Sequence, residues 1–241
     1  MSFTQNFDRE SCPGISLSNL DDDLMGWFVA RALSARGLAL PDSSKPEALL
    51  KHLELWREGQ PTKGALLLFG RKPQSQLKTA LIKISCFAGT APSSKRAKTT
   101  VKGSAFDLID GALDFIQTRD ESVTPLPFKI PADVLREALV NAVAHRDYTV
   151  DASIDVTLLK DRVEIWSPGA LSPSLTIDAL RRPHQSFPRN PRLAHCLYLS
   201  RYSERVGTGT RDMIMTTRGV GLPVPLYSIR DNGFLVTFTG Q

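Results

Sequence analysis

The stretch "LREALVNAVAHRDY", residues 135–148, combines the pattern of a core helix with polar side chains at regular spacing. Four residues advance an α-helix by about 400°, so Glu137, Asn141 and His145 share one stripe of the predicted helix. A polar stripe is costly to bury without partners, so it forms either a solvent-facing surface or one wall of a binding site. The apolar side chains of the stretch lie on another side and predict contact with a core: Leu135, Leu139, Ala142 and Val143.

The composition sets limits on the class of protein. The chain has 241 residues, 41% of them hydrophobic, which is enough for one large domain or two modest ones. It has no run of about 18 apolar residues, and its polar start lacks the apolar core of a signal peptide. Cys12, Cys86 and Cys196 are far apart and form no metal-binding motif. We therefore expect a reduced, cytoplasmic protein without a structural metal and without membrane contact.

The positive charge is unevenly distributed along the chain. The net charge is +5, and residues 59–106 and 179–203 contain no acidic residue. Clustered positive charge attracts phosphate groups, either of nucleic acid or of a nucleotide, and the alternative is a solvated basic face. In the first of these stretches Lys95, Arg96 and Lys98 are the candidate DNA contacts.

Hydrophobic periodicity predicts an alternation of helices and strands. The segment 93–100 reads as a polar, basic loop or sheet edge. Helices are predicted at 20–37, 45–59, 106–117, about 131–146, 176–182 and 191–199, and within 205–213 after a glycine turn. Strands are predicted at 64–70, 79–89, 153–159 and 162–167, followed by a closing hairpin within 226–240 that turns at 231–233.

A proline- and charge-rich segment, 119–130, separates two predicted units. We expect a flexible N-terminal tail over 1–18 and a basic α/β middle domain over 19–125. A nucleotide-binding domain is expected over 126–241, for the reasons that follow.

The segment "EALVNAVAH" resembles the N-box helix of the GHKL ATPases, which include gyrase B, histidine kinases and MutL. In that family the helix supplies a glutamate that activates water and an asparagine that ligates Mg²⁺ on the nucleotide. The resemblance implies that Glu137 is the catalytic base and that Asn141 holds magnesium. It further implies that His145 lies at the same ATP site.

Two later segments resemble further elements of that family. "EIWSPGAL" stands where the family has an Asp-x-Gly-x-Gly loop, with Gly169 at a family glycine and Ser167 in place of the aspartate that binds adenine. "VGTGTRDM" resembles the glycine turn near the phosphates and implies a role for Gly207 and Gly209. Arg192, in "RNPRLA", is a further candidate contact to the cofactor.

The order of these segments resembles one branch most closely. It is the GHKL-like C-terminal region of bacterial transcriptional regulators described as ATP-dependent DNA helicase-related, or RecG-like C-terminal. These proteins normally carry an Alba/Schlafen-type DNA-binding domain, which is not visible here, so a longer protein is expected. The chain has no G-x-x-x-x-G-K-[ST] phosphate loop, so helicase activity is not expected.

The resemblance implies an α/β fold: a two-layer Bergerat (GHKL ATPase-like) sandwich preceded by a smaller α/β unit. It implies an ATP-binding regulatory module, with weak hydrolysis as one alternative, in a bacterial DNA-binding transcription regulator. The other alternative is a degenerate scaffold without nucleotide that serves DNA binding or dimerisation. The expected cofactor is ATP with Mg²⁺, and DNA is the expected partner of the full-length protein. The sequence leaves open whether the protein forms a homodimer.

Overall fold

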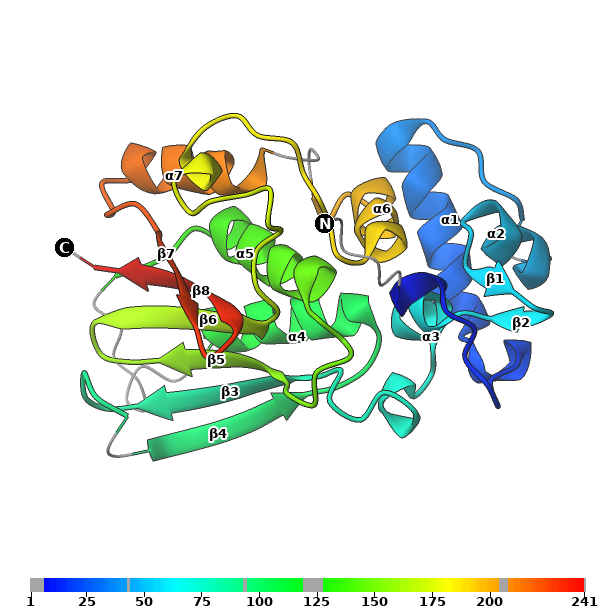
Figure 1. Ribbon diagram of the computed structural model, residues 1–241, viewed down its shortest axis with the longest axis horizontal. Helices are drawn as coiled ribbons and strands as arrows, with labels where there is room; N and C mark the ends of the chain where they lie inside the picture. The colour runs from blue at the N-terminus through cyan, green and yellow to red at the C-terminus, as the bar shows by residue number, and fades with distance from the viewer. Residues whose placement is uncertain (1–6, 43, 93–94, 119–127, 204–207, 241) are drawn as a thin grey trace.

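A mixed six-stranded sheet forms the centre of the computed structural model (Figure 1), which describes residues 7–42, 44–92, 95–118, 128–203 and 208–240. The strand order is β4-β3-β5-β6-β8-β7, and all neighbours are antiparallel except the parallel pair β3 and β5. The strands are β3 (Ile82–Phe87), β4 (Lys95–Val101), β5 (Ile154–Leu158), β6 (Arg162–Pro168), β7 (Leu226–Arg230) and β8 (Gly233–Thr239).

Helices cover one face of this sheet and leave the other face open. Parallel strands require a crossover connection, and α4 (Ala105–Thr118) and α5 (Ala132–His145) lie in the link between β3 and β5. Both helices pack on the same side of the sheet (Figure 1). Along β3, Ile82 and Ile84 are buried and Lys83 is exposed, as expected for a sheet with one solvated face. The predicted α/β sandwich is confirmed.

The remaining helices pack beside the sandwich and share its core. A single cluster of buried side chains includes Phe28, Leu67, Ile84, Leu139 and Leu197. Among the described residues, none of the helices combines the length and apolar character that a membrane span needs. These remaining elements are α1 (Asp22–Arg36), α2 (Pro46–His52), α3 (Lys63–Phe69), α6 (Pro191–Leu199) and α7 (Gly209–Gly219), the short hairpin β1 (Trp56–Arg57) and β2 (Gln60–Pro61), and four 3₁₀ turns, η1 (Phe7–Arg9), η2 (Leu17–Asn19), η3 (Pro73–Ser75) and η4 (Ala179–Arg181).

Two predicted elements differ from the structure. The segment 64–70, predicted as a strand, is helix α3, whose first turn is capped by the hydroxyl of Thr62. Every residue of it from Gly64 to Phe69 is buried, so no polar face reveals its periodicity, and a short apolar run reads equally well as a strand. The helix predicted at 45–59 ends at His52, because Glu54 adopts a positive φ of 56° just after it and residues 56–61 form the hairpin of β1 and β2.

The N-terminal segment is packed rather than tail-like from residue 7 onward. Phe7 and Asp8 are buried, and the ring of Phe7 stacks on Tyr148 with 5.3 Å between centroids. Oδ2 of Asp8 accepts the backbone N–H groups of Arg192 and Leu193 at 2.6 and 3.0 Å, at the start of α6. Residues 7–18, which the sequence predicts as a flexible tail, thus include a carboxylate that caps a helix nearly two hundred residues away.

The predicted boundary between two domains falls in 119–127, outside the described residues. The strands β3 and β4 precede it, and β5 follows it, yet all three belong to the same sheet. The division into 19–125 and 126–241 therefore does not correspond to a break in the sheet.

A buried arginine anchors the end of α5. Arg146 is 1% exposed, and its guanidinium donates to the carbonyl oxygens of Thr79, at 3.1 Å, and of Ala152. The same group lies 4.4 Å from the ring centroid of Tyr148. Buried charge persists only where such partners exist, so these contacts fix the place where α5 stops.

Asp8 makes the stability of the fold depend on pH. Burial raises the pKa of Asp8 from 3.8 to about 6, so the folded state favours the protonated acid. This stabilising contribution is present below about pH 4 and is lost as pH rises through about 6; a two-unit shift corresponds to about 3 kcal/mol. In urea unfolding between pH 4.5 and 7.5, Asp8→Asn should flatten the pH dependence of the free energy of unfolding relative to wild type. Identical slopes in both proteins would contradict this assignment.

Candidate functional site

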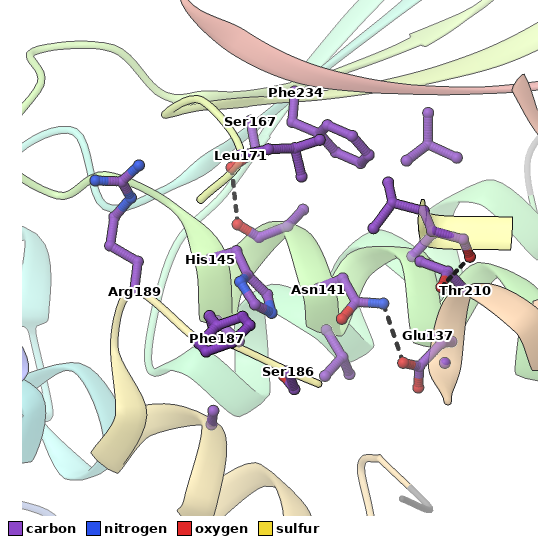
Figure 2. Close-up of a pocket in the computed structure, with 18 of the residues that line it drawn as sticks. Glu137, Asn141, His145, Ser167, Leu171, Ser186, Phe187, Arg189, Thr210 and Phe234 are labelled. Carbon is purple, nitrogen blue, oxygen red and sulfur yellow. Dashed lines mark hydrogen bonds between the residues drawn. The ribbon is translucent and has the colours of Figure 1, made fainter. Parts of the chain in front are cut away.

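A pocket lies between α5, the inner face of β6 and β8, the segment 169–189 and the start of α7 (Figure 2). The polar stripe predicted on α5 faces it, since Glu137, Asn141 and His145 all line the pocket. Three residues spaced four apart on one helix thus supply polar groups along a single wall, as the i, i+4 spacing requires.

The Glu137 end of the pocket meets the N-terminus of α7. Asn141 donates from Nδ2 to Oε1 of Glu137 at 3.0 Å (Figure 2). A methyl group added at Gly209 would lie 1.7 Å from the same Oε1. The carboxylate therefore sits against the first residue of α7, where the helix dipole favours negative charge. Only glycine leaves room for this contact.

The start of α7 is held in place by the elements around it. Thr210 donates from its hydroxyl to the carbonyl oxygen of Leu180 at 2.9 Å, and Tyr227 donates to the carbonyl oxygen of Thr210 at 3.2 Å. Thr208 bonds to the carboxylate of Asp212 at 2.7 Å. These hydrogen bonds therefore fix the position of the helix N-terminus against which Glu137 lies.

His145 lies at the other end of the stripe, beside Phe187 (Figure 2). Burial lowers the pKa of His145 to about 4, and Arg189 and His184 act in the same direction. The imidazole is therefore neutral at neutral pH and offers one donor and one acceptor. Among the residues that the structure describes, no hydrogen bond engages this ring, so both groups can serve a ligand.

Arg189 closes the wall behind His145. Its guanidinium donates to the carbonyl oxygen of Ala170 at 2.9 Å and pairs with Asp147 at 3.3 Å. Gly169 has φ of +114°, and a methyl group there would approach Asp147 to 3.1 Å and Arg189 to 3.2 Å. The predicted glycine is thus required both by its backbone conformation and by close packing.

Ser167 is buried at the back of the pocket. Its hydroxyl donates to the carbonyl oxygen of Ala142 at 2.8 Å and so ties β6 to α5 (Figure 2). A hydroxyl has one proton, so Ser167 can only accept a further hydrogen bond. It therefore presents lone pairs, as the aspartate expected at this place would, but without negative charge.

The rest of the lining is mostly apolar and contrasts with the polar Glu137 end. Glu137 is the only carboxylate of the lining among the described residues. The cavity volume is about 140 Å³, below the roughly 300–1,000 Å³ of small-molecule sites. The apolar side chains are Ile165, Leu171, Leu175, Leu180, Phe187, Phe234 and Val236.

Of the remaining predicted site residues, Arg192 and Lys98, whose side chains the structure describes, do not line this pocket. Arg192 lies elsewhere, because its guanidinium pairs with Glu54 at 2.6 Å and its backbone N–H caps onto Asp8. Gly207 lies outside the described residues. Lys95, Arg96 and Lys98 belong to edge strand β4, where Lys98 is exposed and the side chains of the other two are outside the description.

Sequence reasoning identified Gly169 but missed the apolar residues that the rest of the segment 169–189 contributes. Leu171, Leu175 and Phe187 lie in a loop, so no periodicity marks them as pocket lining. Arg189 is two residues before the start of α6 and three residues before Arg192, and only the fold decides that Arg189 faces the pocket. The small residues Ala138 and Ala144, beside the polar stripe of α5, were a signal in the sequence that this side of the helix leaves room for a ligand, and both line the pocket.

Residues 151–238 match the HATPase_c_4 family model, described as "Putative ATP-dependent DNA helicase recG C-terminal". The matched region holds β5, β6, the segment 169–189, α6, α7 and most of the final hairpin. It begins after α5, so the helix with Glu137 and Asn141 lies outside the match. No curated protein matches the chain.

A solved structure shares the fold. It is the DIP2311 protein from Corynebacterium diphtheriae, with a TM-score of 0.74 and 18% sequence identity. The match covers 98% of this chain and 40% of that chain, so the present sequence spans less than half the length of its structural relative. Because the α5 region and the N-terminal helices are included, the similarity extends well beyond the family match.

The contact between Glu137 and Gly209 can be tested by a methyl group. Gly209→Ala should displace the carboxylate of Glu137 and break its hydrogen bond to Asn141. This loss should offset the roughly 1 kcal/mol by which alanine stabilises a helix relative to glycine. Gly219→Ala, at the other end of α7, is the control, since nothing lies within 4 Å of its added methyl. In urea unfolding the control should be the more stable variant. Equal stabilities would show that Glu137 does not press on Gly209.

Proposed function

We propose that this chain is a nucleotide-binding module that takes ATP with Mg²⁺ in the pocket between α5 and α7. The observation that carries the proposal is the Glu137–Asn141 pair set against the N-terminus of α7, at one end of an otherwise apolar pocket. The HATPase_c_4 match over residues 151–238 supports a nucleotide ligand. The finer role, as the regulatory module of a bacterial DNA-binding transcription regulator, belongs to the same proposal.

The two ends of the pocket suit the two ends of a nucleotide. Backbone N–H groups at the start of α7 favour phosphate, and the apolar side chains around Phe234 and Leu171 suit a planar base. The acceptor-only hydroxyl of Ser167 favours a base that donates there, as the amino group of adenine does. The neutral ring of His145 supplies a second polar contact.

The amide of Asn141 fits the role of a magnesium ligand. Its nitrogen is used by Glu137, and among the described residues its oxygen has no partner. Amide oxygens are hard ligands of the kind Mg²⁺ prefers. A bound Mg²⁺ would neutralise phosphate charge there. Glu137 is then placed to accept a proton from a water molecule that attacks the terminal phosphate.

Binding requires the pocket to widen. The cavity of about 140 Å³ is too small for a whole nucleotide, and the carboxylate of Glu137 occupies the position at α7 that favours an anion. Phosphate would have to displace this carboxylate from Gly209. The segment 169–189 is the wall with the least regular structure and is the element we expect to move.

Mg²⁺–ATP should raise the melting temperature of the chain, because a ligand that binds only the folded state stabilises it. A ligand at about 100 times its dissociation constant adds about 2.7 kcal/mol. Asn141→Ala should abolish the rise, whereas Glu137→Gln should keep binding and lose any hydrolysis. Differential scanning fluorimetry and a phosphate-release assay measure the two effects.

The matched control for this experiment is Asp133→Asn. Asp133 lies one turn before Glu137 on the same stripe but does not line the pocket. Its variant should show the wild-type shift. If millimolar Mg²⁺–ATP leaves the wild-type melting temperature unchanged, the nucleotide proposal fails.

A second candidate function is DNA binding or dimerisation by a scaffold that holds no nucleotide. The specific observation is a pair of exposed lysines on the open face of the sheet. Lys83 on β3 pairs with Thr100, and Lys98 on β4 pairs with Ser85, so both lysines point to the face away from α4 and α5. An exposed basic sheet edge suits the phosphates of a duplex.

Charge reversal tests this alternative. The double variant Lys83→Glu and Lys98→Glu should weaken duplex binding by about tenfold or more and reduce its salt dependence by roughly two phosphate contacts. Lys45→Glu, near the start of α2, is the control with the same change of charge and an exposed side chain. Fluorescence anisotropy at several salt concentrations gives both quantities, and unchanged affinity in the double variant would exclude this surface.

A further inference from the structure

A second cleft opens on the opposite side of Glu137. It is lined by residues of α1, α4 and α5 and by Arg201 and Tyr202 after α6, and its volume is about 530 Å³. Three arginines and two aromatic residues surround it, and Glu137 forms part of its wall: Arg31, Arg136, Arg201, Trp27 and Tyr202. None of these five lines the pocket described above.

The stripe on α5 connects the two cavities. Asp133 precedes Glu137 by one turn and Asn141 follows it by one turn, about 6 Å apart along the axis at each step. Asp133 lines the cleft, Asn141 lines the pocket, and Glu137 lines both. The carboxylate of Glu137 therefore separates the cleft from the pocket.

The cleft also contains three carboxylates, those of Asp110, Asp133 and Glu137, and an ion pair is formed by Asp110. Asp110 pairs with Arg136 at 2.9 Å and also accepts the hydroxyl of Tyr202. Asp133 accepts the backbone N–H of Val134 at 2.9 Å, in the first turn of α5. Arg136 lies 5.6 Å from the ring centroid of Tyr202, so its position is fixed by both contacts.

Among the described residues, Arg31 is an arginine of the cleft that forms no ion pair. Its Nε donates to the carbonyl oxygen of Ser200 at 3.3 Å, which holds the side chain in place. Its terminal nitrogens have no acceptor among the described residues. Arg201 follows at the end of α6 with φ of +61°, a conformation that usually selects glycine, so an arginine is kept there at a cost in strain.

We propose that this cleft is an anion site for inorganic phosphate, reached from the Glu137 end of the nucleotide pocket. Guanidinium groups can donate paired hydrogen bonds to the oxygens of a phosphate. Because Glu137 lines both cavities, the cleft lies next to the place where the terminal phosphate would be released. This inference rests on the proposed function in one respect, because hydrolysis of ATP in the pocket would supply the phosphate. The binding site itself consists only of residues of the cleft.

Isothermal titration calorimetry with inorganic phosphate tests the site on the free chain. Arg31→Gln and Arg201→Gln should each weaken phosphate binding by about tenfold, because each removes a charged donor. Arg218→Gln, an exposed arginine at the far end of α7, should bind as wild type does. Unfolding midpoints near the wild-type value show that the variants fold, and glutamine at position 31 can still reach Ser200.

The outcomes separate this site from the nucleotide pocket. Mg²⁺–ADP affinity should be unchanged in Arg31→Gln, because Arg31 does not line that pocket. Phosphate binding that survives both cleft variants, or that is lost in Asn141→Ala alone, would overturn the proposal. A single-stranded oligonucleotide that binds at Trp27 while phosphate does not would also overturn it. If the chain binds phosphate through Arg31 but never binds Mg²⁺–ATP, the nucleotide proposal fails and the anion site stands.

Discussion

The burial of Arg146 is the constraint on which the arrangement of the site depends. A guanidinium that is 1% exposed must find acceptors, and it finds them in the carbonyl oxygens of Thr79 and Ala152. Asn190 completes this anchor, since its amide donates to the carbonyl oxygens of Ala144, at 3.0 Å, and of Arg146, at 2.8 Å. These contacts tie the end of α5 to the approach to β3, to the approach to β5 and to the start of α6. Because α5 is rigid, fixing one end of it also sets the direction in which its polar stripe faces.

The same anchor connects the pocket to the start of the chain. Arg189 lines the pocket, and Asn190 holds the end of α5. The next turn of the chain, the first of α6, donates backbone N–H groups to the carboxylate of Asp8. A movement of the segment 169–189 would therefore also displace η1. Buried polar groups leave few alternative arrangements, because each donor or acceptor that loses its partner costs about 1–3 kcal/mol. Burial raises the pKa of Asp8, whereas the backbone N–H of Leu193 that it accepts acts in the opposite direction.

The limits of sequence reasoning differ between elements. Alternation of polar and apolar residues correctly identified β3, where one face is solvated, and the amphipathic pattern correctly identified α4 and α5. The same reasoning failed at α3, because a segment buried on all sides carries no period. It also did not identify the cap that Asp8 provides, since nothing local to Asp8 reveals a partner at α6.

The sequence by itself determined that Glu137, Asn141 and His145 lie on one stripe, because helical spacing is a local property. The resemblance to a nucleotide-site helix followed from that stripe and from the glycine segments after it. Only the tertiary structure decided what the stripe faces. It set the carboxylate against Gly209, gave Arg189 rather than Arg192 to the pocket, and opened a second cleft behind Glu137. These facts depend on contacts between residues far apart in the chain, which no local pattern encodes.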